Sequence, residues 1–271
     1  MGDLEKATRP EPTGDPRRFT LLLDEQWGIG PKLHGGYLVA VLARAGIEVA
    51  TVRRPTHTVA QSVTATFLRA PDPGPAALTV DVLRSGRGAS QVRVGLEQDG
   101  ERCVEGTLVL GPLPDHDPVR DLSPEPIALT PREVCPRSPS DGADGRGTLP
   151  LMEVVDTRLD PRTTGFLTGR PSGEGRISGW VALASGDPWT PLGLLVALDV
   201  LPPATFDLGV YGWSPTMSLT AHVHAVPSPG PLRATQWVDH AGADRMTESC
   251  RLWDDTGRLV GQAHQLAAIR R

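Results

Sequence analysis

The stretch Thr190–Pro203, TPLGLLVALDVLPP, decides the fold. Thr190 can cap the free amides of a helix start, and Pro191 fits the first helical position because its missing N–H is not needed there. Two prolines, at 202 and 203, would end the helix. Nearly every residue between them is apolar, which is typical of a helix buried on all sides. The stretch is shorter than the roughly 20 residues of a membrane span, so it predicts a core helix.

One carboxylate, Asp199, interrupts this apolar stretch near the expected C-terminal end of the helix. The helix dipole disfavours a negative charge at that end, and burying an unpaired carboxylate costs several kcal/mol. Asp199 should therefore be well paired or used in chemistry. The structural alternatives are a side chain that reaches solvent at the helix end or one that caps a neighbouring loop.

The composition excludes several classes of protein. The chain has 271 residues, 39% of them hydrophobic, which fits two domains or one large one. A net charge of -5 without a basic block argues against a nucleic-acid partner. The three cysteines are too scattered for a disulfide framework or a zinc site, and the N-terminus lacks the apolar core of a signal peptide. We therefore expect a soluble, cytoplasmic protein without a membrane partner.

A second apolar stretch, YLVAVLARAG, predicts another buried helix, which Gly46 would close. His34, Gly35 and Gly36 stand at its start. Bare backbone amides at a helix N-terminus can hold an anion or a polarised carbonyl oxygen, so these three residues are candidates for substrate binding. The alternatives are that the glycines only allow close packing and that His34 packs or faces solvent.

Strands with alternating apolar and polar residues accompany both helices. In the first half a short strand at 19–23 and the helix precede four such runs, which are separated by turns such as Asp99-Gly100. A segment rich in Pro, Ser, Asp and Gly follows, and strands then resume. We predict a disordered arm at 1–17, a first unit at 18–111, a linker at 112–150 and a second unit at 151–271.

The second unit repeats the first. SVTATFLRAPDPGP, from Ser62, and SLTAHVHAVPSPGP, from Ser218, are identical at seven of fourteen positions at an offset of 156. The two apolar helices also align, and the turn glycines Gly100 and Gly257 match once one residue has been gained. The chain is therefore predicted to be a tandem duplication of one α+β unit, a long buried helix wrapped by an antiparallel sheet.

Three polar residues of the second unit replace apolar residues of the first: Asp199 for Leu42, Gln265 for Leu108 and Thr216 for Ala60. Gln265 shares the apolar face of its strand, so its amide should point inward and need a partner, for which Asp199 is a candidate. In a regular strand Thr216 would face away from its apolar neighbours. However, it follows Pro215 at a strand edge, where the geometry is often irregular.

The chain resembles the double-hotdog acyl-CoA thioesterases, above all the bacterial type II enzymes. The resemblance rests on the order of the elements, the HGG-led helix, the W-x-P-T strand start, the PxPGP turns and the terminal GQAHQLAAIR. It covers residues 19–270 apart from the linker, and it implies a double-hotdog fold and hydrolysis of acyl-CoA thioesters without a cofactor. In that family an Asp on the second hotdog helix, a Thr at the following strand start and a Gln on the last strand hold the attacking water. Asp199, Thr216 and Gln265 stand at the matching positions.

From this resemblance we assign Asp199 as the general base, with Thr216 and Gln265 orienting the water. Amides near Gly35 and Gly36 are the expected oxyanion donors. The alternative function is a hotdog protein that binds acyl groups without hydrolysing them, which the polar trio disfavours. A hotdog dehydratase is a third interpretation, but its usual helix pattern of His or Asp is not evident.

Two histidines, His222 and His224, share a strand face and could bind a metal, but no Cys or acidic ligand near them completes a set. We therefore expect no metal site and place them on an outer face. The edges of hotdog sheets need covering, which favours a homodimer.

Overall fold

The computed structural model describes residues 3–113, 122–141 and 148–270. The strands of the first half are β1 (Glu11–Pro12), β2 (Arg18–Leu23), β5 (Val59–Phe67), β6 (Gly74–Ser85), β7 (Ser90–Gln98) and β8 (Glu101–Gly111). Those of the second half are β9 (Val155–Leu159), β10 (Arg176–Leu183), β11 (Thr216–Val223), β12 (Leu232–Ala241), β13 (Arg245–Trp253) and β14 (Leu259–Ala268). These twelve strands form one antiparallel sheet, and β3 (Gly28–Ile29) and β4 (Lys32–Leu33) form a separate pair.

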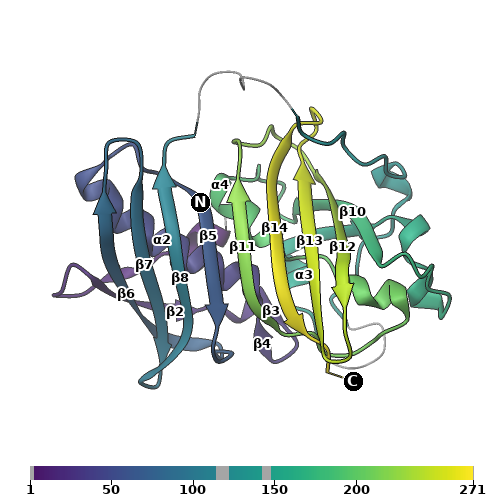
Figure 1. Cartoon of the computed structure of the whole chain (residues 1–271), viewed down its shortest axis with the longest axis horizontal. Coiled ribbons are helices and arrows are strands. Elements are labelled where there is room, and N and C mark those ends of the chain that lie inside the picture. Colours follow the sequence, from purple (N-terminus) through teal and green to yellow (C-terminus); the bar gives the residue numbers. More distant parts are fainter. Residues whose placement is uncertain (1–2, 114–121, 142–147, 271) are drawn as a thin grey trace.

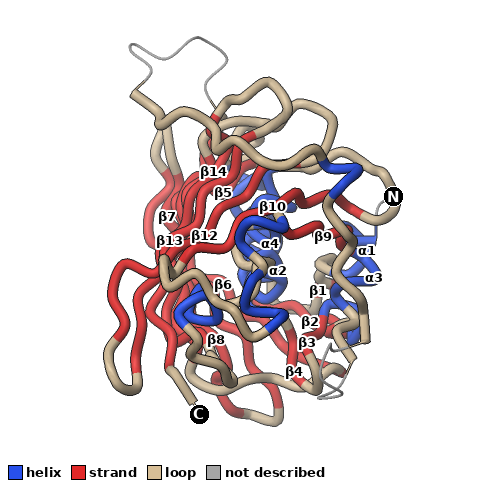
Figure 2. Tube along the Cα trace, turned by 90° about the vertical axis from the view of Figure 1, so that its right-hand side faces the viewer, coloured by secondary structure: helices blue, strands red, loops and turns tan. Residues whose placement is uncertain are grey.

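The helices are α1 (Asp3–Ala7), α2 (Gly35–Arg53), α3 (Leu151–Val154) and α4 (Pro191–Ala197). Short 3-10 helices are η1 (Glu25–Trp27), η2 (Arg132–Val134), η3 (Pro161–Thr163), η4 (Gly165–Thr168) and η5 (Ala204–Leu208). Figure 1 shows the broad sheet in front of the helices, and the side view in Figure 2 places α2 and α4 together against its inner face. The core lies between this face and the two helices.

The order of the strands confirms the double-hotdog fold. The first half reads β2-β6-β7-β8-β5 and the second, from the other end of the sheet, β10-β12-β13-β14-β11. The halves join where β5 pairs with β11, and Thr64 lies opposite Thr220 with the hydroxyl oxygens 3.2 Å apart. These two residues are 156 apart, which is the offset of the duplication. The local two-fold axis between the halves therefore passes through this pair, and each half covers one sheet edge of the other.

Helix α2 is longer than the sequence pattern indicated. His34 caps its start, and 11 of its 19 residues are buried. It does not end at Gly46 but continues to Arg53. Gly46 serves close packing and not a helix end, because it faces the sheet, where a Cβ atom would lie 3.1 Å from Val92 Cγ2. Among the described residues α2 is also the helix long and apolar enough to cross a membrane, but 61% of its most apolar window is buried, and the core helix of a globular domain passes the same test.

Helix α4 is shorter than expected. Thr190 caps it by accepting a hydrogen bond from the Gly193 amide, as predicted, but the helix ends at Ala197 and not at the two prolines. The prediction of a long helix in each half is therefore wrong for the second half. Pro202 and Pro203 have no backbone N–H, so the carbonyls one turn before them cannot receive helical hydrogen bonds. The chain from Leu198 onward turns away, and Asp199 lies just beyond the helix end.

From Asp3 onward the N-terminal arm is folded, in contrast to the predicted disorder of residues 1–17, of which residues 1–2 lie outside the described part. Leu4 and Ala7 on α1 are buried in the core, and β1 pairs with β2. The Ala7 carbonyl accepts a hydrogen bond from the Tyr37 hydroxyl at 2.8 Å. Sequence reasoning missed this segment because its apolar residues are too few and too widely spaced among charges and prolines to show a period.

The described parts of the predicted linker also pack on the second half. The Trp180 indole donates to the Thr130 carbonyl at 2.9 Å, and the Trp253 indole donates to the Pro124 carbonyl at 3.1 Å. Other parts of the predicted linker, residues 114–121 and 142–147, lie outside the described residues. The segment is therefore an ordered strap where it is described.

We predict that Leu4→Ala destabilises the protein by about 2–4 kcal/mol, because it opens a cavity where α1 joins the core. Urea unfolding measures the change. The control is Glu5→Ala, an exposed neighbour in the same helix, which should leave the stability nearly unchanged. Equal stabilities of the two variants would show that the arm does not contribute to the core.

Candidate active site

Asp199 binds the N-terminus of the other half's helix. Its Oδ2 accepts a hydrogen bond from the Gly36 amide at 2.8 Å, and its side chain is only 9% exposed. The sequence placed this carboxylate at the unfavourable end of its own helix, but in the structure it lies at the positive end of α2. That end stabilises a negative charge through its dipole and its free amides. Asp199 is therefore buried and paired, and it does not face solvent.

His34 holds Asp199 from the other side. Its Nδ1 accepts from the Tyr37 amide at 3.3 Å, so the ring proton must be on Nε2. Nε2 lies 2.8 Å from the Asp199 carbonyl oxygen, to which it donates, and 3.4 Å from the Asp199 carboxylate. The His34 side chain is 2% exposed, and both ring nitrogens have partners in the protein. His34 thus contacts the proposed base, whereas a direct contact with substrate stays a prediction.

The two glycines serve close packing as well as hydrogen bonding. A Cβ atom on Gly35 would lie 2.8 Å from Asp199 Oδ2, and one on Gly36 would lie 2.7 Å from the Leu195 carbonyl oxygen. Any larger residue would force α2 and α4 apart. The Gly36 amide already donates to Asp199, so in this structure it is not free to bind a substrate oxygen.

Thr216 and Gln265 are joined by a side-chain hydrogen bond. The Thr216 hydroxyl donates to Gln265 Oε1 at 2.8 Å. A bulge between Thr216 and Ser218 turns Thr216 inward. Its side chain therefore does not follow the regular alternation of inward and outward side chains along the strand. The first half has the same irregularity between Ala60 and Ser62, so the bulge belongs to the duplicated unit.

The partner of the Gln265 amide nitrogen is not Asp199 but Glu248, a residue that sequence reasoning missed. Gln265 Nε2 donates to Glu248 Oε1 at 2.7 Å, and among the described residues no hydrogen bond joins Gln265 to Asp199. Glu248 Oε2 accepts from the Ala204 amide at 3.0 Å. A signal was available, because Glu248 alternates with the apolar Met246 and Cys250 on one strand face and must therefore point inward.

Burial dominates the electrostatics of the two acids. It raises the pKa of Asp199, while His34 and the Gly36 amide oppose that rise. Burial and, to a smaller extent, the charge of Asp199 raise the pKa of Glu248 to about 7, against hydrogen bonds from Ala204, Gln236 and Gln265. The two carboxylates therefore sense each other, and their titrations are coupled.

A small cavity brings these elements together. Its lining includes Leu198, which precedes Asp199, together with Glu248 and Gln265. In this structure the cavity has no room for a water molecule.

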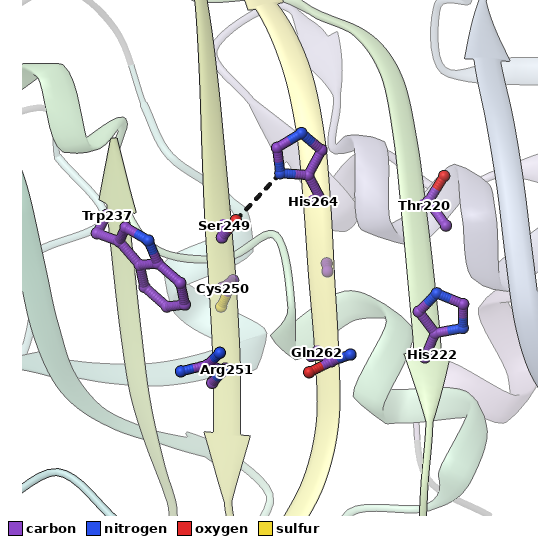
Figure 3. A pocket seen from close by; sticks show the side chains of 9 residues that line it. Thr220, His222, Trp237, Ser249, Cys250, Arg251, Gln262 and His264 are labelled. Atoms are coloured by element: carbon purple, nitrogen blue, oxygen red, sulfur yellow. Dashed lines mark hydrogen bonds between the residues drawn. The ribbon is translucent and has the colours of Figure 1, made fainter. Parts of the chain in front are cut away.

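A larger hollow, of about 240 Å³, lies on the outer face of the sheet (Figure 3). There Ser249 Oγ lies 3.0 Å from His264 Nδ1, and Asp239 lies 3.4 Å from the same nitrogen. In a catalytic triad the serine and the acid contact opposite ring nitrogens, so this exposed cluster is not one. His222 lies on β11 and lines this hollow, and His224 is exposed directly after the strand, which confirms their predicted outer-face position.

Comparisons with known proteins agree with the fold and extend it. The family model of the acyl-CoA thioesterase N-terminal domain matches residues 23–111, and that of the C-terminal domain matches residues 132–269. An uncharacterized protein of Mycobacterium tuberculosis is 34% identical, over 94% of this chain and 93% of its own. Residues 112–131 lie between the two matched ranges.

Solved structures show the same architecture. A thioesterase II candidate from Thermobifida fusca has 32% identity and a TM-score of 0.87 over 100% of this chain and 98% of its own. The acyl-CoA thioesterase II TesB2 of Mycobacterium marinum has 18% identity and a TM-score of 0.68 over 98% of each chain. The dehydratase domain of PpsC from Mycobacterium tuberculosis, in complex with C12:1-CoA, has 16% identity and a TM-score of 0.58 over 98% and 99% of the two chains. At this low identity the last two support the fold alone.

We predict that Gly36→Ala lowers the stability by about 1–3 kcal/mol, because the new methyl group would overlap the Leu195 carbonyl. Thermal unfolding measures the loss. Gly14→Ala is the matched control, since its Cβ atom would have no neighbour within 4 Å. A stable Gly36→Ala protein would contradict the tight contact between α2 and α4.

We also predict a pH dependence of stability that comes from Glu248. Its pKa is raised, from 4.5 to about 7, so its contribution to stability is complete below about pH 4.5 and is lost as pH rises through 7. Glu248→Gln cannot titrate. Between pH 5 and 8, the free energy of unfolding of the wild type should therefore fall relative to that of Glu248→Gln by on the order of 2 kcal/mol.

Urea unfolding at several pH values measures this difference. Asp254→Asn is the control, because Asp254 is buried in the same strand region but its pKa is shifted the other way. Burial alone would raise that pKa, whereas hydrogen bonds from Thr256, Ser228 and Arg258 lower it. Parallel curves for the wild type and Glu248→Gln would contradict the raised pKa of Glu248.

Proposed function

The chain belongs to the acyl-CoA thioesterase family, and from this we propose that it hydrolyses acyl-CoA thioesters with a water activated by Asp199. The observation that carries the proposal is the position of Asp199. A carboxylate is buried at the N-terminus of α2, where the duplicated position of the other half has Leu42. Such a group is costly to bury, and it occurs in only one of two related units.

In the proposed step, the two Asp199 oxygens have different roles. Oδ2 is held by the Gly36 amide, while Oδ1 makes no hydrogen bond with the described residues and is left to take a proton from water. The water oxygen attacks the thioester carbonyl carbon as its proton passes to Asp199. The carbon–sulfur bond then breaks, and the proton leaves with the sulfur as a free thiol. The raised pKa of Asp199 makes it a stronger base for the first of these transfers.

Thr216 and Gln265 would orient the water. The Thr216 hydroxyl gives its proton to Gln265, so its oxygen remains free to accept a hydrogen bond from the water. For the oxyanion we propose the Gly35 amide. The amides of Gly36 and Tyr37 have acceptors, and Leu38 donates to the His34 carbonyl, whereas the Gly35 amide donates no hydrogen bond to the described residues.

We predict that Asp199→Asn reduces hydrolysis by about 10²–10⁴-fold, because the amide cannot accept the proton from water. Release of free thiol from a panel of acyl-CoAs measures the rate, and it also reports the preferred chain. The control is Asp187→Asn, an exposed carboxylate before α4, which should keep full activity.

The same assay separates hydrolysis from mere acyl binding. A wild-type protein that binds acyl-CoA at equilibrium but releases no thiol would support the non-catalytic alternative. Normal turnover by a folded Asp199→Asn protein would refute the role of Asp199 and leave the family assignment intact.

A further inference from the structure

Glu248 ties together two parts of the site that are distant in sequence. One of its oxygens accepts from the side-chain amide of Gln265 on β14, and the other accepts from the backbone amide of Ala204. Ala204 opens η5 and ends the segment that begins at Asp199. With a side chain 2% exposed, Glu248 makes these bonds away from solvent. Its carboxylate therefore fixes both the Gln265 amide and the chain that follows Asp199.

This arrangement sets the orientation of the Gln265 amide. When Glu248 is ionised it can only accept, so the nitrogen of Gln265 must face Glu248 and its oxygen must face Thr216. The Thr216 hydroxyl then has to donate to Gln265, which leaves its oxygen as an acceptor. If the Gln265 amide flipped, Thr216 would become a donor toward the site instead. The direction of all the hydrogen bonds is thus determined at Glu248.

A comparison of the two halves shows that the Gln265–Glu248 pair is specific to the second half. Gln265 and Glu248 are directly opposite each other on β14 and β13, and the corresponding pair on β8 and β7 is Leu108 and Val92. A cross-strand pair that is apolar in one half is therefore polar in the other. Gln265 and Glu248 bind each other, so each buried polar group has the hydrogen-bond partner that burial requires. Packing alone does not need this polar pair, because an apolar pair fills the same place in the first half.

We propose that Glu248 is a positioning residue for hydrolysis, which holds Gln265 and Thr216 in the orientation that receives the attacking water and anchors the segment after Asp199. This inference rests on the proposed function. It adds to the Asp, Thr and Gln of the resemblance a second carboxylate that acts through Gln265 and does not touch substrate.

The charged surroundings of Glu248 are simple. Asp199, on the segment after α4, is the nearby group whose charge acts on it, and Cys250 lies two residues away on β13. Burial raises the pKa of Cys250, so that side chain stays a neutral thiol. The neighbours from β12 and β14 are the neutral amides Gln236 and Gln265. A loss of charge at Glu248 should therefore be sensed mainly by Asp199.

The test uses Glu248→Gln in the full chain, with thiol release from acyl-CoA as the readout. The new amide presents a donor to either Gln265 or Ala204, so the hydrogen-bond direction is lost while the size is kept. We expect kcat to fall by about 10–100-fold with KM changed by less than about threefold. We also expect the acidic limb of the pH–rate profile to move to lower pH, because the ionisation of Glu248, with a pKa of about 7, no longer contributes to it.

Two further variants exclude a merely structural effect. In a Gln265→Ala background, Glu248→Gln should lower kcat by less than about twofold, since Glu248 would have no amide left to orient. Asp254→Asn removes another buried carboxylate that accepts backbone amides, and it should leave the acidic limb in place. Glu248→Asp keeps the charge on a shorter side chain, so its kcat should lie between those of the wild type and Glu248→Gln. If Glu248→Gln does not fold, a Glu248→Asp protein with the kcat of the wild type would overturn the proposal.

The outcomes separate this inference from the function on which it rests. An unchanged kcat and acidic limb in Glu248→Gln, or full additivity with Gln265→Ala, would overturn the role of Glu248 while hydrolysis by the wild type stands. A wild-type protein that releases no thiol would overturn the proposed function itself, and this inference with it.

Discussion

The hydrogen bond between the Gly36 amide and the Asp199 carboxylate is the contact on which the site depends. It joins the helix start of one half to the helix end of the other, and it places a buried negative charge where the α2 dipole and a free amide stabilise it. Gly35 and Gly36 lack the side chains that would block this approach. His34 closes the arrangement by capping α2 with one ring nitrogen and donating to Asp199 with the other. The geometry of the candidate site therefore follows from how the two halves dock.

Duplication made that docking available, and later divergence changed its use. The two-fold axis passes between Thr64 and Thr220, and α2 packs against α4 across the junction of the two halves. Symmetry would allow two equivalent sites. Only the second half has polar residues at the three aligned positions, and Leu42 and Leu108 fill the first half's positions of Asp199 and Gln265. The first half keeps apolar residues at these positions, and the second half carries buried polar groups there at a cost in stability.

The polar groups come as connected partners, which is what burial requires. Thr216, Gln265 and Glu248 form a chain of hydrogen bonds in which each donor has an acceptor, and the chain ends on the Ala204 amide. The bulge that turns Thr216 inward is present at the corresponding point of the first half, where it orients only Ala60. The scaffold for a polar site thus existed in the repeated unit, and three side chains on two strands and a strand edge were enough to use it.

The sequence by itself determined the duplication of an α+β unit, the inward direction of Gln265 and the irregular strand start at Thr216, because alternation and repeated turn motifs are local properties. The double-hotdog fold was implied by the resemblance to the thioesterase family. The sequence also identified Asp199 as an anomaly. Only the tertiary structure decided what Asp199 binds, since Gly36 and His34 are more than 160 residues away in the chain. The end of α4 and the order of the N-terminal arm likewise depend on packing, and Glu248 became recognisable when its partners were known. Local patterns specify which side a residue faces, but the identity of its neighbour depends on how distant segments meet.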